Sequence, residues 1–406
     1  MTASDRPSTL PPLSSIEEEH SRAVARVIRE QILAADGWVP FETFMDLALY
    51  APGLGYYSAG GTKIGAGGDF TTAPELSDLF SACVARQCAE VLGRTGGSIL
   101  ELGAGTGRMA STVLETLASL GVVPERYAIL EVSADLRDRQ RARIEPLPES
   151  LKQRVVWLDE LPAERARGVV LANEVLDALP FHRVVVREGV ARALGVSLSA
   201  GGSFVESERA ANPSLAAAWA RIARALPAAL PEGYRTEVCL QVEPWIASLS
   251  DGLEAGVMLF FDYGLPRTHY YHAQRNRGTL RCHFKQRAHD DPFVNVGVQD
   301  ITAWVDFTRV AESADAAGLQ VRGFATQAAF LLGLGIEGMV ATGLASTDGA
   351  KDGSDSSIRA QAQRASEARQ LLMPGEMGEV FKVMALARNF DDPLSGFSLQ
   401  DLRHSL

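Results

Sequence analysis

Cysteine is scarce in this chain of 406 residues, and its number and placement argue against a structural zinc site and against a disulfide-held fold. The four cysteines, Cys83, Cys88, Cys239 and Cys282, include no pair at the CxxC spacing typical of a structural zinc site. They are also too few for a fold held together by disulfides. We interpret them as buried or inert thiols of a reducing compartment.

Long apolar runs and an excess of positive charge are also missing. No stretch of about 18 apolar residues could cross a membrane, and the N-terminus carries Asp5 and then three glutamates in place of the basic start of a secretory signal. The 39 Lys and Arg against 50 Asp and Glu leave a net charge of −11, the wrong sign for binding phosphates or anionic lipid. We therefore expect a cytoplasmic protein with no membrane insertion and no nucleic-acid partner, whose substrate is cationic or neutral.

Apolar residues make up 46% of the chain, enough for a large core. From Ser98 onward, short apolar runs alternate with helical patterns, which is typical of a parallel sheet covered by helices on both faces. The fold class predicted is α/β, with a mostly parallel seven-stranded sheet. The strands are expected at residues 98–102, 127–131, 155–158, 168–172 and 257–262, with the last two near 319–324 and 379–387.

The remaining segments predict how the chain is divided. Ser15 and Glu18 resemble a capping box at the start of the first helix, and a second helix is expected over residues 41–50. A helix is also expected over residues 301–317 and a loop over 346–357. The divisions predicted are a tail (1–14), an N-terminal helical cap with a glycine-rich lid (15–95), an α/β domain (96–390) with insertions at 182–236 and 264–300, and a C-terminal tail (391–406).

A glycine motif follows the first predicted strand. It reads Glu-Leu-Gly-Ala-Gly-Thr-Gly over residues 101–107, a G-x-G-x-G spacing that differs from the G-x-G-x-x-G of dinucleotide sites and suits S-adenosylmethionine. Glu131 ends the second strand, where an acid can accept hydrogen bonds from both ribose hydroxyls, and Asp159 follows the third, within reach of an adenine amino group. The residues predicted to bind the cofactor here are Glu101, Gly103, Ala104, Gly105, Gly107, Glu131 and Asp159.

Acids also follow the fourth and fifth strands. Asn173, Glu174 and Asp177 lie where a substrate would meet the methyl donor, and two carboxylates three residues apart can converge on one cation. A guanidinium has a pKa above about 12, so methylating it requires a group that orients it and takes its proton. Asp262 ends the fifth strand on the same edge, either as support for this site or as a residue of the turn. The predicted catalytic residues are Asn173, Glu174, Asp177 and Asp262. The alternative is that Glu174 and Asp177 are helix-start acids with a ribose contact.

Two missing motifs and the histidines narrow the chemistry further. The chain has no Asn/Asp-Pro-Pro-Tyr after the fourth strand and no Pro-Cys pair, which argues against methylation of a nucleic-acid base. His283 and His289 have no Cys or acidic partner at a spacing typical of zinc, so we expect no metal. We expect these histidines to line a substrate groove or face solvent.

Several motifs together resemble one family over residues 40–387, that of the mitochondrial complex I assembly-factor protein arginine methyltransferase and its bacterial relatives. The motifs are Leu49-Tyr50-Ala51-Pro52, Gly55-Tyr56-Tyr57, Gly68 to Glu75, Glu101 to Gly107, Asn173-Glu174, Asp177 to Pro180, Gly278 to Arg281, Gln299 to Thr302, Val305-Asp306-Phe307, Met377-Gly378 and Phe381-Lys382-Val383.

The resemblance implies a class I, Rossmann-like, S-adenosylmethionine-dependent methyltransferase, whose mitochondrial members symmetrically dimethylate an arginine of a complex I subunit. It further implies that Asn173, Glu174 and Asp177 face the target side chain. The loop with Gly68, Asp69, Phe70 and Thr72 would close over the cofactor, and the two insertions would dock the partner.

Three functions stay open at this point. The first is arginine methylation of a partner protein. The second is methylation of a small molecule or another side chain, and the third is a cofactor-binding assembly chaperone without turnover. The intact carboxylate pair argues against the third. The sequence does not predict the partner, the number of methyl groups or the oligomeric state.

Overall fold

A mostly parallel sheet forms the centre of the computed structural model, which describes residues 10–60, 68–69, 71–342 and 355–406. Seven of its eight strands follow the order β15-β16-β10-β5-β2-β3-β4, and the short β14 pairs with β10 beside this path. Along this path, β16 is the one strand that runs in the opposite direction to the others. The bounds are β2 (Ser98–Leu102), β3 (Tyr127–Leu130), β4 (Val155–Leu158), β5 (Ala166–Asn173), β10 (Leu253–Leu265), β14 (Val305–Asp306), β15 (Gln320–Thr326) and β16 (Phe381–Arg388).

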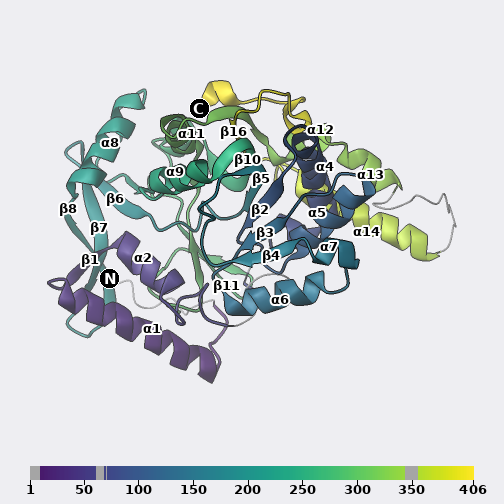
Figure 1. The fold of residues 1–406 in the computed structure, drawn as a ribbon. Coiled ribbons are helices and arrows are strands. Elements are labelled where there is room, and N and C mark those ends of the chain that lie inside the picture. The colour runs from purple at the N-terminus through teal and green to yellow at the C-terminus, as the bar shows by residue number, and fades with distance from the viewer. Residues whose placement is uncertain (1–9, 61–67, 70, 343–354) are drawn as a thin grey trace.

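Alternating side chains of each central strand enter two different cores. In β5, Val169 and Leu171 join one core and Val170 and Ala172 the other, so residues 169–172 are all apolar. Helices cover both faces (Figure 1). The first face carries α4 (Asp78–Thr95), α5 (Arg108–Ser119), α6 (Ala134–Ile144), α7 (Glu149–Lys152), α12 (Gln327–Gly333), α13 (Ile336–Thr342) and α14 (Asp355–Leu372). The second face carries α9 (Val242–Gly252) and α11 (Phe307–Ala316).

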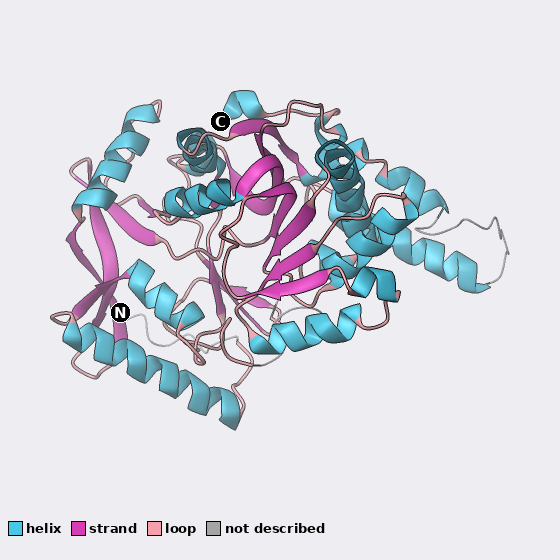
Figure 2. Cartoon of the chain, in the orientation of Figure 1, coloured by secondary structure: helices cyan, strands magenta, loops and turns pink. Residues whose placement is uncertain are grey.

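The N-terminal segment and the first insertion share a smaller sheet, on the left in Figure 2. In this sheet β1 (Trp38–Pro40), which precedes the α/β domain, pairs with β7 (Val190–Leu198) of the insertion. The other strands are β6 (His182–Arg187), β8 (Phe204–Ala210) and β9 (Arg235–Val238). The sheet lies between α1 (Ser15–Ala34) with α2 (Phe41–Tyr50) on one face and α8 (Pro213–Ala225) on the other. The predicted cap and first insertion are therefore one packed structure.

The second insertion forms a three-stranded sheet ordered β12-β11-β13. Its strands are β11 (Arg281–Phe284), β12 (Arg287–His289) and β13 (Asp300–Thr302). The short helices α3 (Ala73–Leu76) and α10 (Arg267–Tyr270) and the 3-10 turns η1 (Ser395–Phe397) and η2 (Arg403–Ser405) complete the described elements. In the described part of the chain, we find no helix with the length and apolar content needed to cross a membrane.

Three local predictions need correction. The capping box is formed by Ser14 and Glu17, one residue earlier than predicted, because both of its hydrogen bonds are made by that pair. The predicted helix over 301–317 begins only at Phe307, where Asp306 caps it, because the preceding residues pair with β11 and β10.

The C-terminal segment packs back on the sheet, since Leu402 N donates to Phe324 O. Most of the loop predicted over 346–357 lies outside the described residues, and α14 begins at Asp355.

Candidate active site

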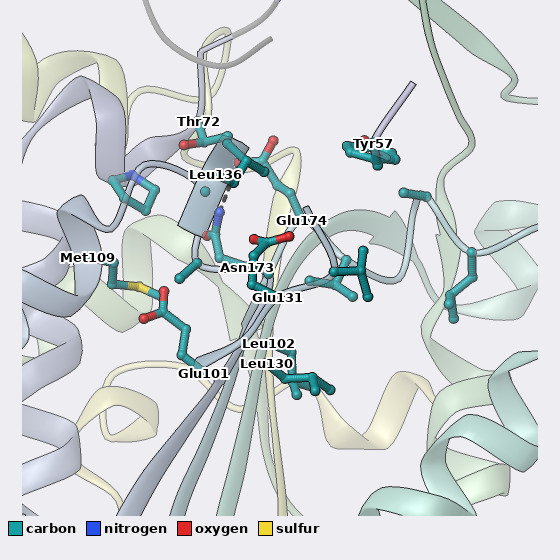
Figure 3. Close-up of a pocket in the computed structure, with 18 of the residues that line it drawn as sticks. Tyr57, Thr72, Glu101, Leu102, Met109, Leu130, Glu131, Leu136, Asn173 and Glu174 are labelled. Carbon is teal, nitrogen blue, oxygen red and sulfur yellow. Dashed lines mark hydrogen bonds between the residues drawn. The ribbon is translucent and has the colours of Figure 1, made fainter. Parts of the chain in front are cut away.

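A cavity of about 400 Å³ lies at the carboxyl ends of β2, β3 and β5 (Figure 3). Its wall includes Glu75, Glu101, Glu131 and Glu174, and no Lys, Arg or His is among the described residues that line it. The structure brings eight of the predicted site residues to this wall: Thr72, Glu101, Gly103, Ala104, Gly105, Glu131, Asn173 and Glu174. All charged side chains on the described wall are therefore acidic, which favours a ligand that carries positive charge.

The glycine turn shapes one side of the cavity. Gly103, Gly105 and Gly107 have φ values of +63°, +53° and +83°, a left-handed backbone that favours glycine. A Cβ on Gly107 would lie 3.0 Å from Gln140 Cα, so this glycine allows close packing on α6 and does not line the cavity. The turn is also tied to α3, since Thr106 Oγ1 donates to Glu75.

The two carboxyls beside the glycine turn have firm partners. Glu101 is 1% exposed, and Tyr127 donates its hydroxyl hydrogen bond to it at 2.6 Å. Burial raises the pKa of Glu101 to about 7. Glu131 accepts from Ser133 N at 2.9 Å and from Gln140 Nε2 at 3.0 Å. Burial raises its pKa too, although these bonds oppose the shift. Both side chains are therefore held in place before any ligand arrives.

Glu174 occupies an unusual backbone position at the end of β5. Its φ is +53°, which is uncommon for a residue with a side chain and points to a functional constraint. The turn is fixed by Glu174 N, which donates to Phe261 O at 2.8 Å. Asn173 Nδ2 donates to Glu174 Oε1 at 3.1 Å. Burial, and then the charge of Asp177, raises the pKa of Glu174 to about 8.

Asp177 and Asp262 lie behind this turn and outside the cavity wall. Asp262 is 1% exposed and accepts from Leu176 N at 2.9 Å and from Asp177 N at 3.2 Å, so it holds the turn that presents Glu174. Asp177 is 5% exposed, and burial raises its pKa to about 6. Its Oδ1 has no hydrogen-bond partner among the described residues. Neither of these two predicted catalytic residues therefore lines the cavity: Asp262 holds the turn that follows Glu174, and Asp177 acts on Glu174 through its charge.

Asp300 and Tyr57 join this acidic group, although neither was predicted as a site residue. Tyr57 lines the cavity, and its hydroxyl donates to Asp300 Oδ1 at 2.9 Å. Asp300 is 2% exposed, and burial, then the charge of Asp177, raises its pKa to about 7. Both residues belong to motifs that carried the family resemblance. Nothing local shows that these motifs meet, because 243 residues separate them.

Other predicted residues lie away from the cavity wall. Asp159 is 89% exposed and pairs with Arg137 at 2.8 Å. Asp69 accepts from Lys285 N at 2.6 Å and from Tyr56 Oη at 2.8 Å, and Gly68 lies beside it. Phe70 and most of the predicted lid, residues 61–67, lie outside the described residues. His283 and His289 lie on the β11–β12 hairpin, away from the wall.

Comparisons with known proteins agree with this geometry. A family model described as "Putative S-adenosyl-L-methionine-dependent methyltransferase" matches residues 83–325. A Drosophila melanogaster protein, Protein arginine methyltransferase NDUFAF7 homolog, mitochondrial, is 28% identical over 77% of this chain and 74% of its own length. The Danio rerio protein named Protein arginine methyltransferase NDUFAF7, mitochondrial is 28% identical over 90% of this chain and 87% of its own.

A solved structure resembles the whole chain. It is the crystal structure of a superfamily member from Burkholderia thailandensis bound to S-adenosyl-homocysteine. It is 40% identical and superposes with a TM-score of 0.90 over 98% of this chain and 100% of its own. A second crystal structure from the same organism superposes with a TM-score of 0.87 at 40% identity.

The comparisons also correct one expectation drawn from the sequence. The acidic N-terminus and the lack of a signal predicted a cytoplasmic protein. The curated relatives contradict this prediction, because they are named mitochondrial.

Proposed function

Because the chain belongs to the family of S-adenosyl-L-methionine-dependent methyltransferases, we propose that the acceptor of its methyl group is an arginine side chain of a partner protein. Membership confirms the predicted enzyme class, fold class and cofactor. The curated relatives are named protein arginine methyltransferases, which supports a protein substrate. A respiratory complex I subunit as the partner, and symmetric dimethylation, are the finer proposals that the family resemblance implies.

The cavity fits the cofactor on its glycine side. The backbone of Gly103 and Gly105 lines the wall, and an approaching ligand meets no side chain there. We propose that Glu131 accepts hydrogen bonds from the ribose hydroxyls and that Glu101 faces the positively charged amino group of the methionine portion. When bound, the cofactor supplies a methyl group on a positively charged sulfur. The residues Ala104 and Thr72 complete this half of the wall.

Glu174 is the residue that carries the arginine proposal. It is a carboxyl on the cavity wall whose one hydrogen bond from a neighbouring side chain comes from Asn173, and Asp177 and Asp300 raise its pKa further. A positively charged guanidinium that enters the cavity would offset the negative charge of Asp177 and Asp300 and stabilise the ionised form of Glu174. The carboxylate would then orient one nitrogen and accept the proton that this nitrogen loses on methylation.

A labelling experiment tests the proposal. The purified protein is incubated with labelled methyl donor and lysate from a strain lacking it, and labelled residues are identified by mass spectrometry. Label on arginine that depends on Glu174 supports the proposal. Glu188→Gln is a matched control for Glu174→Gln, because Glu188 also has a left-handed φ, +51°, but is exposed in the β6–β7 turn. Label confined to small molecules or to another residue type would overturn the arginine assignment.

A further inference from the structure

Two tyrosine rings wall the half of the cavity that lies away from the glycine turn. Tyr50 and Tyr57 both line it, with ring centroids 5.5 Å apart and planes 22° from parallel. Figure 3 shows Tyr57 across the cavity from Met109 and Glu101, with Glu174 drawn between them. The proposed cofactor residues lie on the glycine side, so this aromatic wall is left to the acceptor.

The chain positions Tyr57 by doubling back on α2. A Cβ on Gly55 would lie 2.4 Å from Tyr50 N, so only glycine allows the backbone to pass this close. Tyr57 N then donates to Leu49 O at 2.8 Å, and Tyr56 N donates to Ala48 O at 2.9 Å. This return places Tyr57 beside Tyr50.

Both hydroxyls are engaged within the protein. Tyr50 donates to Ala178 O at 2.9 Å, and Tyr57 donates to Asp300 Oδ1 at 2.9 Å. Asp300 is itself fixed, since Ile301 N donates to the same Oδ1 at 2.9 Å. What the two side chains offer the cavity is therefore aromatic ring surface. A carboxylate that accepts a hydrogen bond from the phenol also makes the ring of Tyr57 more electron-rich.

We propose that Tyr57 is a substrate-binding residue whose ring stacks against the target guanidinium, while Glu174 accepts hydrogen bonds from the guanidinium N–H groups. Asp300 is the residue that positions this ring. The proposal rests on the arginine function argued above. A planar, weakly hydrated guanidinium stacks well on an aromatic face, whereas a lysine ammonium is compact and strongly hydrated. The wall would thus favour arginine over lysine as the acceptor.

Tyr56 shows the competing, purely structural role for a tyrosine here. It is 2% exposed, packs edge-on against Tyr57 and donates to Asp69 at 2.8 Å. If Tyr57 served only the core in this way, removing its ring would affect folding but not the recognition of a peptide by folded protein.

The test compares Tyr57→Leu, Tyr57→Phe and Asp300→Asn on a peptide that spans the arginine labelled by the wild-type protein. Tyr57→Leu should raise KM for the peptide by about five- to thirtyfold, the range of a cation–π contact, with cofactor affinity by calorimetry unchanged. It should also reduce the preference for this peptide over one with lysine at the same position. Tyr57→Phe keeps the ring, so it and Asp300→Asn should raise KM less. The control Phe397→Leu removes a ring in η1, outside the cavity wall and both insertions, and should leave KM unchanged.

The outcomes separate the two proposals. If the wild-type protein labels arginine and folded Tyr57→Leu has the wild-type KM, the inference about the aromatic wall is wrong and the arginine function stands. If Tyr57→Leu loses cofactor affinity as much as peptide affinity, Tyr57 belongs to the cofactor side, which also overturns the inference. If Tyr57→Leu does not fold, Tyr57→Phe and Asp300→Asn decide: a raised KM in either supports the inference, and an unchanged KM in both overturns it. If the wild-type protein labels no arginine, both proposals fall.

Discussion

The two halves of the cavity differ in how completely their polar side chains are hydrogen-bonded. Beside the glycine turn, Glu101 accepts from Tyr127, and Glu131 accepts from Ser133 N and Gln140 Nε2. On the other side, Glu174 accepts from Asn173 Nδ2 and from the backbone of Ala73, but Asn173 Oδ1 has no partner among the described residues. The first half is organised before its ligand binds, whereas the second has hydrogen-bonding capacity left over for one.

The halves also differ in how their acids are grouped. Burial raises the pKa of Glu101 and Glu131 as well, but on the acceptor side the charge of Asp177 further raises the pKa of both Glu174 and Asp300. Such a group is unfavourable in the ligand-free protein and becomes favourable when a cation enters. From this comparison we expect the acceptor half to gain binding energy from a positively charged substrate.

The largest expected effect comes from Glu174→Gln. The amide keeps the size of the side chain but can neither take a proton nor balance a guanidinium, so the rate of methyl transfer should fall by about a hundredfold to ten-thousandfold. Cofactor affinity should change by no more than a few fold, because the cofactor contacts proposed lie on the glycine side. Rate and calorimetry on the same preparations check this, with Glu188→Gln as control. Equal loss of both would remove the distinction between the halves.

Gly103→Val should affect the opposite half. Gly103 has a φ of +63°, and its Cβ would lie 3.6 Å from Val175 Cγ2, so valine would strain the turn and fill space at the wall. Affinity for the cofactor should fall by roughly tenfold to 150-fold, and Glu131→Ala should act in the same direction. Gly121→Val is the control, since Gly121 has a similar φ of +72° with nothing within 4 Å of its Cβ. Wild-type affinity in Gly103→Val would contradict the assignment of this half to the cofactor.

A third prediction uses pH to isolate the acceptor half. Glu174 has a folded-state pKa of about 8 against an ordinary value of 4.5. Between these values the folded protein holds a proton that the unfolded chain has lost, so the free energy of unfolding should fall as pH rises from about 5 to 8. Glu174 contributes at most about 1.4 kcal/mol per pH unit to this fall. Denaturant titrations of cofactor-free protein should show a shallower fall in Glu174→Gln. Identical slopes would mean that Glu174 is ionised throughout.

The smallest effect is expected at Asp159. Its side chain is 89% exposed and paired with Arg137 outside the cavity wall, so Asp159→Ala should change cofactor affinity less than about twofold. Calorimetry beside Glu131→Ala measures the contrast. A loss as large as that of Glu131→Ala would mean that Asp159 reaches the cofactor when it binds.

The sequence alone determined the features that depend on neighbouring residues. The apolar runs of β2 and β4 were predicted at their observed bounds, because a buried parallel strand is apolar at successive positions. The glycine turn, Glu131 and Glu174 directly follow β2, β3 and β5, so their approach at one sheet edge could be predicted from the order of the motifs.

Only the tertiary structure decided the rest. The predicted helix over 301–317 lost its first residues to strands whose partners lie elsewhere in the chain, in β10 and β11. Asp262 proved to hold the backbone of the turn before Asp177, across 85 residues of sequence. Asp300 reached Tyr57 across 243 residues. Local patterns carry no information about such pairs, because hydrogen bonding and burial between distant segments arise only when the chain has packed.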